Sequence, residues 1–335
     1  MKKIAHITLL AALLVSLAVP ALAAGKGKPP VGPGDTIEFV SCFGPGGGHD
    51  VMLRTMEKAI RENSIFPNPI IFTYKPGGNQ AVGMMHTRGQ GGRSDLLMST
   101  TNSLINMPLQ MDVGVKYTDL TSLAVWGTQY HFFWVKKDKA EKEGWKTLED
   151  LIKYSEQPGK HVTFTTSGVG SLEELIVEHL KTAHPNADLR ILAVDGDAEA
   201  VVQLLGDHVE VMINEPAGGG TENYAADGDI IALVTSGAER STFFPEVPTL
   251  TELGYNYSSD GFRGIMGPPN MSPEAIAWWQ DILTKISNTD TFKEYMKVNG
   301  IEPKFLIGDA LDAYFLEYKD NMRGAFTLAG IKTID

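Results

Sequence analysis

Three glycine-rich loops are the places in the sequence where a ligand could be held. They occupy residues 44–50 (GPGGGHD), 75–80 (KPGGNQ) and 165–171 (TTSGVGS). Glycine lets backbone N–H groups approach a ligand closely, and a helix N-terminus carries roughly half a positive charge. Such loops suit an anion, either a phosphate or a carboxylate, although glycines also serve simple tight turns.

Known catalytic and nucleotide-binding motifs do not occur in the chain. No P-loop Lys-Ser/Thr pair follows the glycines, and His49 stands where a dinucleotide fingerprint needs its third glycine. The HExxH zinc motif and the GxSxG nucleophile motif are also absent. His49 and Asp50 could form an acid–base pair, but aspartate at a helix start is more often a cap. These observations predict a binding protein without metal or cofactor rather than an enzyme.

Single side chains outside the glycines offer two different ligand contacts. Arg263 could bind a carboxylate with its guanidinium group, or form a structural ion pair with an acid. Asp195 or Asp197 could receive an ammonium group, which would favour an amino acid. Since the arginine favours a second carboxylate and the aspartates favour a cation, these residues leave the ligand open.

The elements that position these residues follow a strand–loop–helix pattern. Short apolar runs alternate with stretches of helical period, which indicates an α/β fold whose ligands bind at the carboxyl ends of the strands. Helices are expected over 50–61 and 198–205, and helix starts at Thr147 and Ser171. Strands are expected at 37–40, 70–73, 95–99, 132–135, 162–165, 191–194, 209–213 and 230–235.

Composition and the N-terminal residues indicate an exported globular protein. The chain has 335 residues, 43% of them hydrophobic, and a single cysteine, Cys42, which excludes a disulfide framework. Its formal net charge of −12 argues against nucleic acid as a partner. Two lysines, an apolar run and Ala21-Leu22-Ala23 predict a cleaved signal peptide at 1–23 and a flexible linker at 24–34. We therefore expect the mature protein in the periplasm.

The ordered set of loops resembles the extracytoplasmic solute receptors of the tripartite tricarboxylate transporter family, often called Bug receptors. The first loop is similar to a PFPPGGxxD motif and the second to an NRPGAGGxxG motif of that family. Four further segments are similar to family motifs: 99–108, 166–175, 204–214 and 240–250. Departures from the family patterns occur at His49, Asn79, Gln80, Asn214 and the acidic stretch 195–197.

The resemblance implies a two-lobed, periplasmic-binding-protein-like α/β fold of type II character, with the ligand in the cleft between the lobes. It places lobe 1 at 35–125 and 236–335, and lobe 2 at 126–235. It implies a monomeric periplasmic receptor that passes a small carboxylate to the large and small membrane subunits of a transporter. Two hypotheses from other classes stay open: an exported enzyme acting on a small carboxylic acid, and a signalling receptor without transport.

In family members, backbone N–H groups of the first two glycine loops hold the ligand carboxylate, and the second lobe selects the rest. On this basis we expect the ligand to be bound by Phe43, Gly46, Gly47, Gly48, His49, Asp50, Gly77, Gly78, Asn79, Thr101, Asn102, Ser103, Thr166, Ser167, Gly168, Ser171, Asp195, Asn214 and Arg263.

Overall fold

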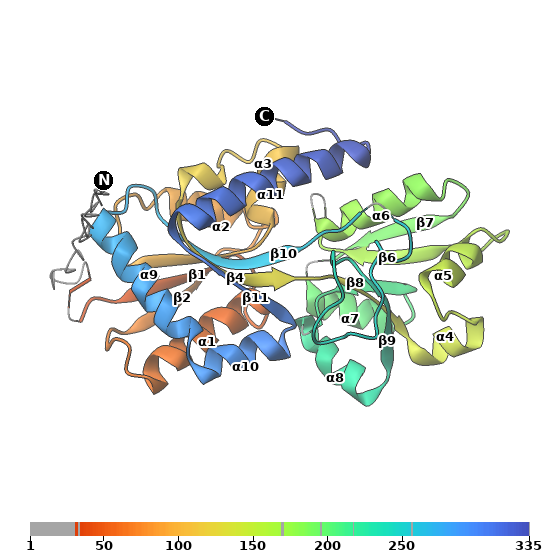
Figure 1. Cartoon of the computed structure of the whole chain (residues 1–335), viewed down its shortest axis with the longest axis horizontal. Coiled ribbons are helices and arrows are strands. Elements are labelled where there is room, and N and C mark those ends of the chain that lie inside the picture. Colours follow the sequence, from red (N-terminus) through yellow and green to blue (C-terminus); the bar gives the residue numbers. More distant parts are fainter. Residues whose placement is uncertain are drawn as a thin grey trace, which may run out of the picture.

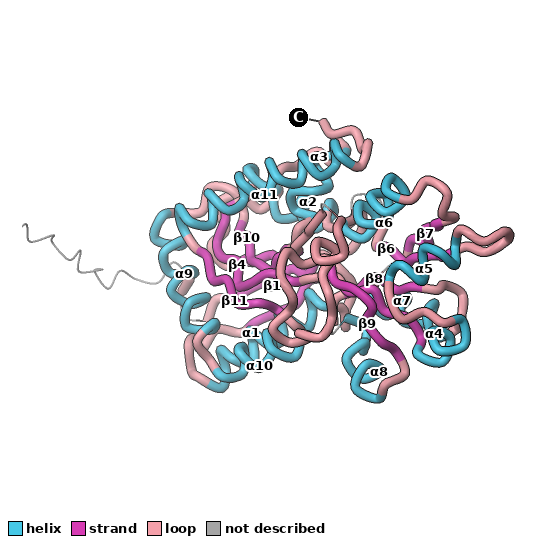
Figure 2. Tube along the Cα trace, turned by 45° about the vertical axis from the view of Figure 1, so that its right-hand side comes forward, coloured by secondary structure: helices cyan, strands magenta, loops and turns pink. Residues whose placement is uncertain are grey.

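The chain folds into two β-sheets that lie side by side, each flanked by helices (Figure 1, Figure 2). The computed structural model describes residues 31–32, 34–168, 171–194, 196–216, 218–255 and 257–334. The expected signal peptide at 1–23 and residues 24–30 and 33 of the expected linker lie outside the described residues. None of the described helices is long and apolar enough to cross a bilayer.

The larger sheet has six strands in the order β11-β4-β10-β3-β1-β2. β1 pairs in parallel with β2 and β3, whereas β10 is antiparallel to β3 and β4, and β11 is antiparallel to β4. Its strands are β1 (Ile37–Ser41), β2 (Ile70–Tyr74), β3 (Leu96–Thr100), β4 (Thr121–Gln129), β10 (Gly261–Gly267) and β11 (Ile301–Leu306). The helices of this half are α1 (Gly48–Glu62), α2 (Ala81–Arg88), α3 (Ser103–Gln110), η1 (Tyr117–Asp119), α9 (Pro273–Ser287), α10 (Asp290–Val298) and α11 (Gly308–Leu328).

The smaller sheet has five strands in the order β7-β6-β8-β5-β9. β6 pairs in parallel with β7 and β8, and β5 is antiparallel to β8 and β9. Its strands are β5 (Phe132–Lys136), β6 (Val162–Thr166), β7 (Leu189–Ala193), β8 (Val211–Asn214) and β9 (Ile230–Thr235). The helices of this half are α4 (Lys137–Glu143), α5 (Leu148–Ser155), α6 (Leu172–Ala183), α7 (Asp197–Leu205), η2 (Gly218–Gly220) and α8 (Thr221–Asp227).

Local sequence signals account for the helices that begin at the carboxyl ends of strands. α1 buries Met52, Met56 and Ile60 at helical spacing, which attaches it to the larger sheet. The Ser171 hydroxyl accepts a hydrogen bond from the backbone N–H of Glu174 at 3.1 Å and so caps α6. Thr147 caps α5 in the same way through Asp150. These helix starts therefore confirm the capping predictions made from the sequence.

The chain crosses between the sheets twice, once after β4 and once in the segment 236–260 before β10. The two crossings are bonded to each other: the backbone N–H of Ser236 donates to the His131 carbonyl at 2.9 Å, and the backbone N–H of His131 donates to the Ser236 hydroxyl at 3.0 Å. The expected lobe boundary at 125/126 falls inside β4, which belongs to the larger sheet up to Gln129.

Candidate functional site

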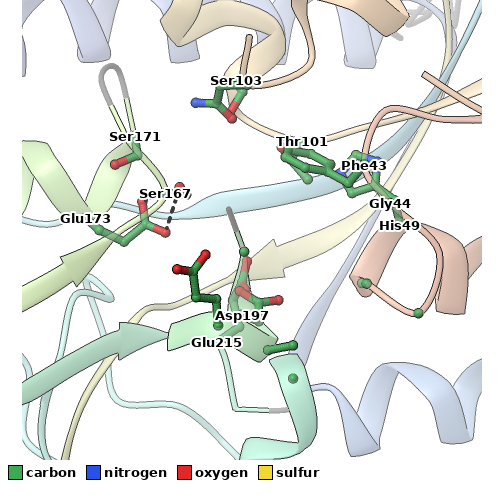
Figure 3. A pocket seen from close by; sticks show the side chains of 18 of the residues that line it. Phe43, Gly44, His49, Thr101, Ser103, Ser167, Ser171, Glu173, Asp197 and Glu215 are labelled. Carbon is green, nitrogen blue, oxygen red and sulfur yellow. Dashed lines mark hydrogen bonds between the residues drawn. The ribbon is translucent and has the colours of Figure 1, made fainter. Parts of the chain in front are cut away.

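A cavity of about 470 Å³ lies between the two halves of the molecule, and residues from both halves line it (Figure 3). Its walls follow the carboxyl ends of β1, β3, β6 and β8, the place where α/β folds bind ligands. The lining comprises Phe43, Gly44, Pro45, Gly46, Gly47, Gly48, His49, Asn79, Thr101, Asn102, Ser103, His131, Ser167, Ser171, Glu173, Gly196, Asp197, Ala198, Glu199, Glu215, Gly219 and Arg263.

The cavity brings together most of the binding residues expected from the sequence, but not all of them. Of the described residues on that list, six are outside the lining: Asp50, Gly77, Gly78, Thr166, Gly168 and Asn214. Asp195 lies outside the described residues. The sequence interpretation did not select Glu173, Glu215 and His131 as ligand contacts, although all three line the cavity. The cavity therefore has a more acidic wall on the side of the smaller sheet than the sequence indicated.

The first glycine loop forms the entry to α1. Gly46 has a φ of +82°, and its N–H donates to Oδ2 of Asp50 at 2.8 Å, so this N–H is already engaged. Gly47 is the N-cap with a φ of −78°, which any residue can adopt. A Cβ atom at Gly48 would come within 2.9 Å of a guanidinium nitrogen of Arg263. The glycine at 48 therefore leaves room for the arginine beside the first turn of α1.

The Asp50 side chain holds the first glycine loop in place through hydrogen bonds. Its carboxylate accepts hydrogen bonds from Gly46 N–H, from the Tyr74 hydroxyl at 2.7 Å and from Nε of Arg54 at 3.0 Å. Burial opposes ionisation of this carboxyl, but the hydrogen bonds outweigh burial and lower the pKa of Asp50. His49 bonds elsewhere, with Nδ1 2.7 Å from the Ser99 hydroxyl. The two neighbours therefore do not form the acid–base pair that the sequence left open.

An Asp50→Asn variant is expected to lose about 1–3 kcal/mol of unfolding free energy at pH 7, because the amide places a donor against Tyr74 or Arg54. The folded-state pKa of Asp50 is lowered, so the carboxylate stabilises the fold above its unfolded pKa and that stability is lost as the pH falls through the folded pKa. Urea unfolding at pH 7 and pH 3 should show a smaller deficit at pH 3 than at pH 7.

The matched control for this variant is Asp112→Asn. Oδ1 of Asp112 also accepts a glycine N–H, from Gly114 at 2.9 Å, but in an exposed turn. The control should leave the urea midpoint nearly unchanged at both pH values. An equal deficit of the Asp50 variant at both pH values would contradict an ionised, hydrogen-bonded carboxylate.

The second glycine loop reaches the cavity through one side chain. Gly77, Gly78, Asn79 and Gln80 all have positive φ, which is costly for the last two. Gln80 is fully buried, and its amide donates to the Thr101 hydroxyl at 2.7 Å and accepts from the Thr100 hydroxyl at 3.1 Å. Oδ1 of Asn79 accepts from the Ser103 hydroxyl at 2.8 Å. Gln80 thus ties this loop to β3 and holds Asn79 at the cavity wall.

Arg263, on β10, is only 6% exposed. Its Nε donates to the side-chain oxygen of Gln129, and one terminal nitrogen lies 3.3 Å from Oε1 of Glu215. Of the two roles that the sequence left open for this arginine, the structure thus shows the ion pair with an acid. Because Arg263 lies on β10 of the larger sheet and Glu215 directly follows β8 of the smaller one, the pair also connects the two halves at the cavity.

The wall on the side of the smaller sheet carries buried ionisable groups. Nε2 of His131 lies 3.6 Å from Oε1 of Glu173, which also accepts a hydrogen bond from the Ser167 hydroxyl at 3.2 Å. Burial disfavours the imidazolium, but the Glu173 carboxylate outweighs burial and raises the pKa of His131. Burial and the nearby charge of Glu215 raise the pKa of Asp197 to about 7. Among the described residues no group of three His, Cys, Asp or Glu side chains is placed to hold a metal ion.

Two sheets joined by two chain crossings, with a cavity lined from both halves, define a two-lobed solute-binding protein. A sequence model described as "Tripartite tricarboxylate transporter family receptor" matches residues 52–314. The chain belongs to this receptor family. The resemblance stated from the loop motifs is thereby confirmed.

Named relatives are similar over most of the chain. Protein BugT of Bordetella pertussis is 24% identical over 306 residues, which are 90% of this chain and 91% of the relative. The structure of the periplasmic binding protein BugD superposes with a TM-score of 0.77 at 19% identity, covering 89% of this chain and 98% of that chain. R. palustris Rpa4515 with adipate superposes with a TM-score of 0.76 at 18% identity and the same coverage, 89% and 98%. At these identities the superpositions show a shared fold.

Proposed function

We propose that this chain is a periplasmic receptor that captures a small carboxylate between its lobes and delivers it to the large and small membrane subunits of a tripartite tricarboxylate-type transporter. The observation that carries the proposal is the cavity of about 470 Å³ at the N-terminus of α1, lined by hydroxyl and amide groups from loops of both halves. A helix N-terminus attracts a carboxylate through its free N–H groups and its dipole. The adipate in the structure of R. palustris Rpa4515 supports the same class of ligand.

Receptor function is favoured over catalysis by the engagement of the candidate acid–base groups. Asp50 is held by Tyr74 and Arg54, and His49 by Ser99, so neither points at the other as an activated pair would. Burial and the charge of Arg263 also lower the pKa of His49 well below its ordinary value, which leaves the imidazole neutral at pH 7. The proposed role is therefore binding and release without chemical change.

A thermal-shift screen of the mature chain over mono-, di- and tricarboxylates, aromatic acids and amino acids tests this proposal. A ligand at a hundred times its Kd should add about 2.7 kcal/mol to the unfolding free energy. The acid that shifts Tm most should also reduce the radius of gyration in solution scattering, because both lobes line the cavity and a ligand that bridges them closes the hinge.

Three results would contradict the proposal. They are the absence of a Tm shift with any acid, identical scattering profiles at saturation, and conversion of the bound acid into a product after incubation with the protein. Uptake of the labelled acid by cells with and without the receptor separates transport from signalling. Transport requires that uptake fall when the receptor alone is deleted.

A further inference from the structure

The cavity carries more carboxylates than cations. Glu173, Asp197, Glu199 and Glu215 line it, whereas its cationic side chains among the described residues are Arg263 and His131, whose imidazolium form the Glu173 carboxylate favours. Figure 3 shows Glu173, Asp197 and Glu215 on the side opposite Phe43 and His49. A ligand carboxylate adds a further negative charge to this enclosed space, where charges interact more strongly than in water. The charge balance of the wall therefore bears directly on which carboxylates can bind.

Two of these carboxylates are paired with cations of the wall, and a third, Glu199, is exposed. Glu215 lies 3.3 Å from Arg263, and Glu173 lies 3.6 Å from His131. Asp197, the first residue of α7, is partly buried and forms no ion pair with any described residue. It is therefore the carboxylate of this wall that a cationic ligand group would neutralise.

His49, on the opposite wall, adds no positive charge to this balance. It is 2% exposed, and burial together with the charge of Arg263 lowers the pKa of its imidazole well below the ordinary value. Among the described residues, the cations that face the acidic wall are therefore Arg263 and His131, and each of them already lies beside a glutamate.

We propose that the preferred ligand is a carboxylate that also carries a protonated amine, an amino acid or an ω-amino acid, with its ammonium group held by Asp197. The inference rests on the proposed function, because it takes the carboxylate to lie near the first turn of α1. An overall neutral zwitterion adds no net charge to the acidic cavity, whereas a dicarboxylate adds two negative charges. An analogue that lacks the amine would leave Asp197 unpaired. A polar site of this kind discriminates against such an analogue more strongly than an apolar pocket does.

The ionisation of Asp197 provides an independent readout. The groups that face it are Glu215, Arg263, Glu173 and His131, and burial together with Glu215 raises its pKa to about 7. A bound ammonium group would lower this pKa, so binding at pH 7 should release a fraction of a proton. Affinity should then rise with pH, by up to about tenfold per unit, between the bound-state pKa and pH 7. An amine-free acid would release no proton from Asp197.

Titration calorimetry with matched acids tests the inference. Each acid of three to six carbons is offered amine-free, with an α-amine and with an ω-amine, together with 3-phenylpropanoate and phenylalanine. The best amine-bearing acid should bind at least tenfold more tightly than its amine-free analogue and should release protons in buffers of different ionisation enthalpy. The Asp197→Asn variant should lose at least tenfold in affinity for that ligand and should abolish the proton release.

The control Glu149→Gln removes a carboxylate that is 57% exposed on α5, and it should change neither affinity nor proton release. Tighter binding of an amine-free acid, or equal binding of both forms, would overturn the inference and leave the proposed function intact. Equal affinity in a folded Asp197→Asn variant would also overturn it, and wild-type proton release does not depend on that variant folding. No binding by any acid would overturn the inference and the proposed function together.

Discussion

An Arg263→Leu variant is expected to lose about 3–5 kcal/mol of unfolding free energy at pH 7. Arg263 is 6% exposed, and its guanidinium group serves both Gln129 and Glu215, so its removal leaves a cavity-wall carboxylate and the buried side-chain oxygen of Gln129 without this partner. Breaking a buried pair by removing one member costs several kcal/mol, because the remaining charge stays desolvated. Equilibrium urea unfolding of the unliganded protein measures this loss directly.

Two further variants separate the ion pair from general disruption. Replacing both partners, as Arg263→Leu with Glu215→Leu, should recover a large part of the loss, because no unpaired charge then remains. The control is Arg240→Ala, which breaks a pair with Glu252 at 2.9 Å in which both side chains are 44% exposed, and the urea midpoint should hardly move. If the double variant is as unstable as the sum of the two single variants, the coupling across the cavity is absent.

Much of the larger sheet could be predicted because its first strands are short apolar runs that end in glycine loops. The expected strands at 37–40, 70–73 and 95–99 match β1, β2 and β3 closely. β4, β10 and β11 were not predicted as strands. β10 reads GFRGIMG and β11 contains Pro303, so glycine and proline mask the periodicity of strands that are set by their pairing with β4.

The cavity wall on the side of the larger sheet could be predicted from the sequence, whereas much of the wall on the side of the smaller sheet could not. Loops after β1 and β3 carry their signal locally, as glycines and Thr-Asn-Ser clusters, and these residues line the cavity. Glu173 lies in the first turn of α6, where acidic residues are common in any helix, so nothing in the sequence marked it as a ligand contact. Glu215 is the neighbour of Asn214, which the sequence analysis expected to bind the ligand. Their burial beside His131 and Arg263 comes from contacts between distant segments, which spacing along the chain does not reveal.

The glycines of the second loop show the limit of reasoning from motifs. The sequence predicted Gly77 and Gly78 as ligand contacts, and both have a positive φ that glycine tolerates, yet neither lines the cavity. Asn79 and Gln80 share that backbone conformation, and their side chains make the contacts with Thr101 and Ser103. In this loop the contacts with β3 and α3 are therefore made by two side chains that depart from the family pattern, and not by the glycines that match it.

Asp197→Asn is expected to stabilise the unliganded protein at pH 8 by about 2–4 kcal/mol, while it leaves stability at pH 4 nearly unchanged. The pKa of Asp197 rises from 3.8 to about 7 on folding, because burial and Glu215 disfavour its charge. One pKa unit corresponds to about 1.36 kcal/mol. Since the unfolded chain releases this proton at lower pH than the folded chain, the wild-type protein loses stability as the pH rises from about 4 to 7.

Urea unfolding from pH 4 to 8 should therefore show a difference between Asp197→Asn and wild type that grows with pH and levels off above pH 7. Glu149→Gln is the control, because it removes an exposed carboxylate outside the cavity, and its difference from wild type should stay small across this range. A difference that stays constant across this range would show that Asp197 ionises normally in the folded state. Growth of the difference, combined with weaker binding of an amine-bearing acid, would mean that the receptor retains a destabilising charge because its ligand neutralises it.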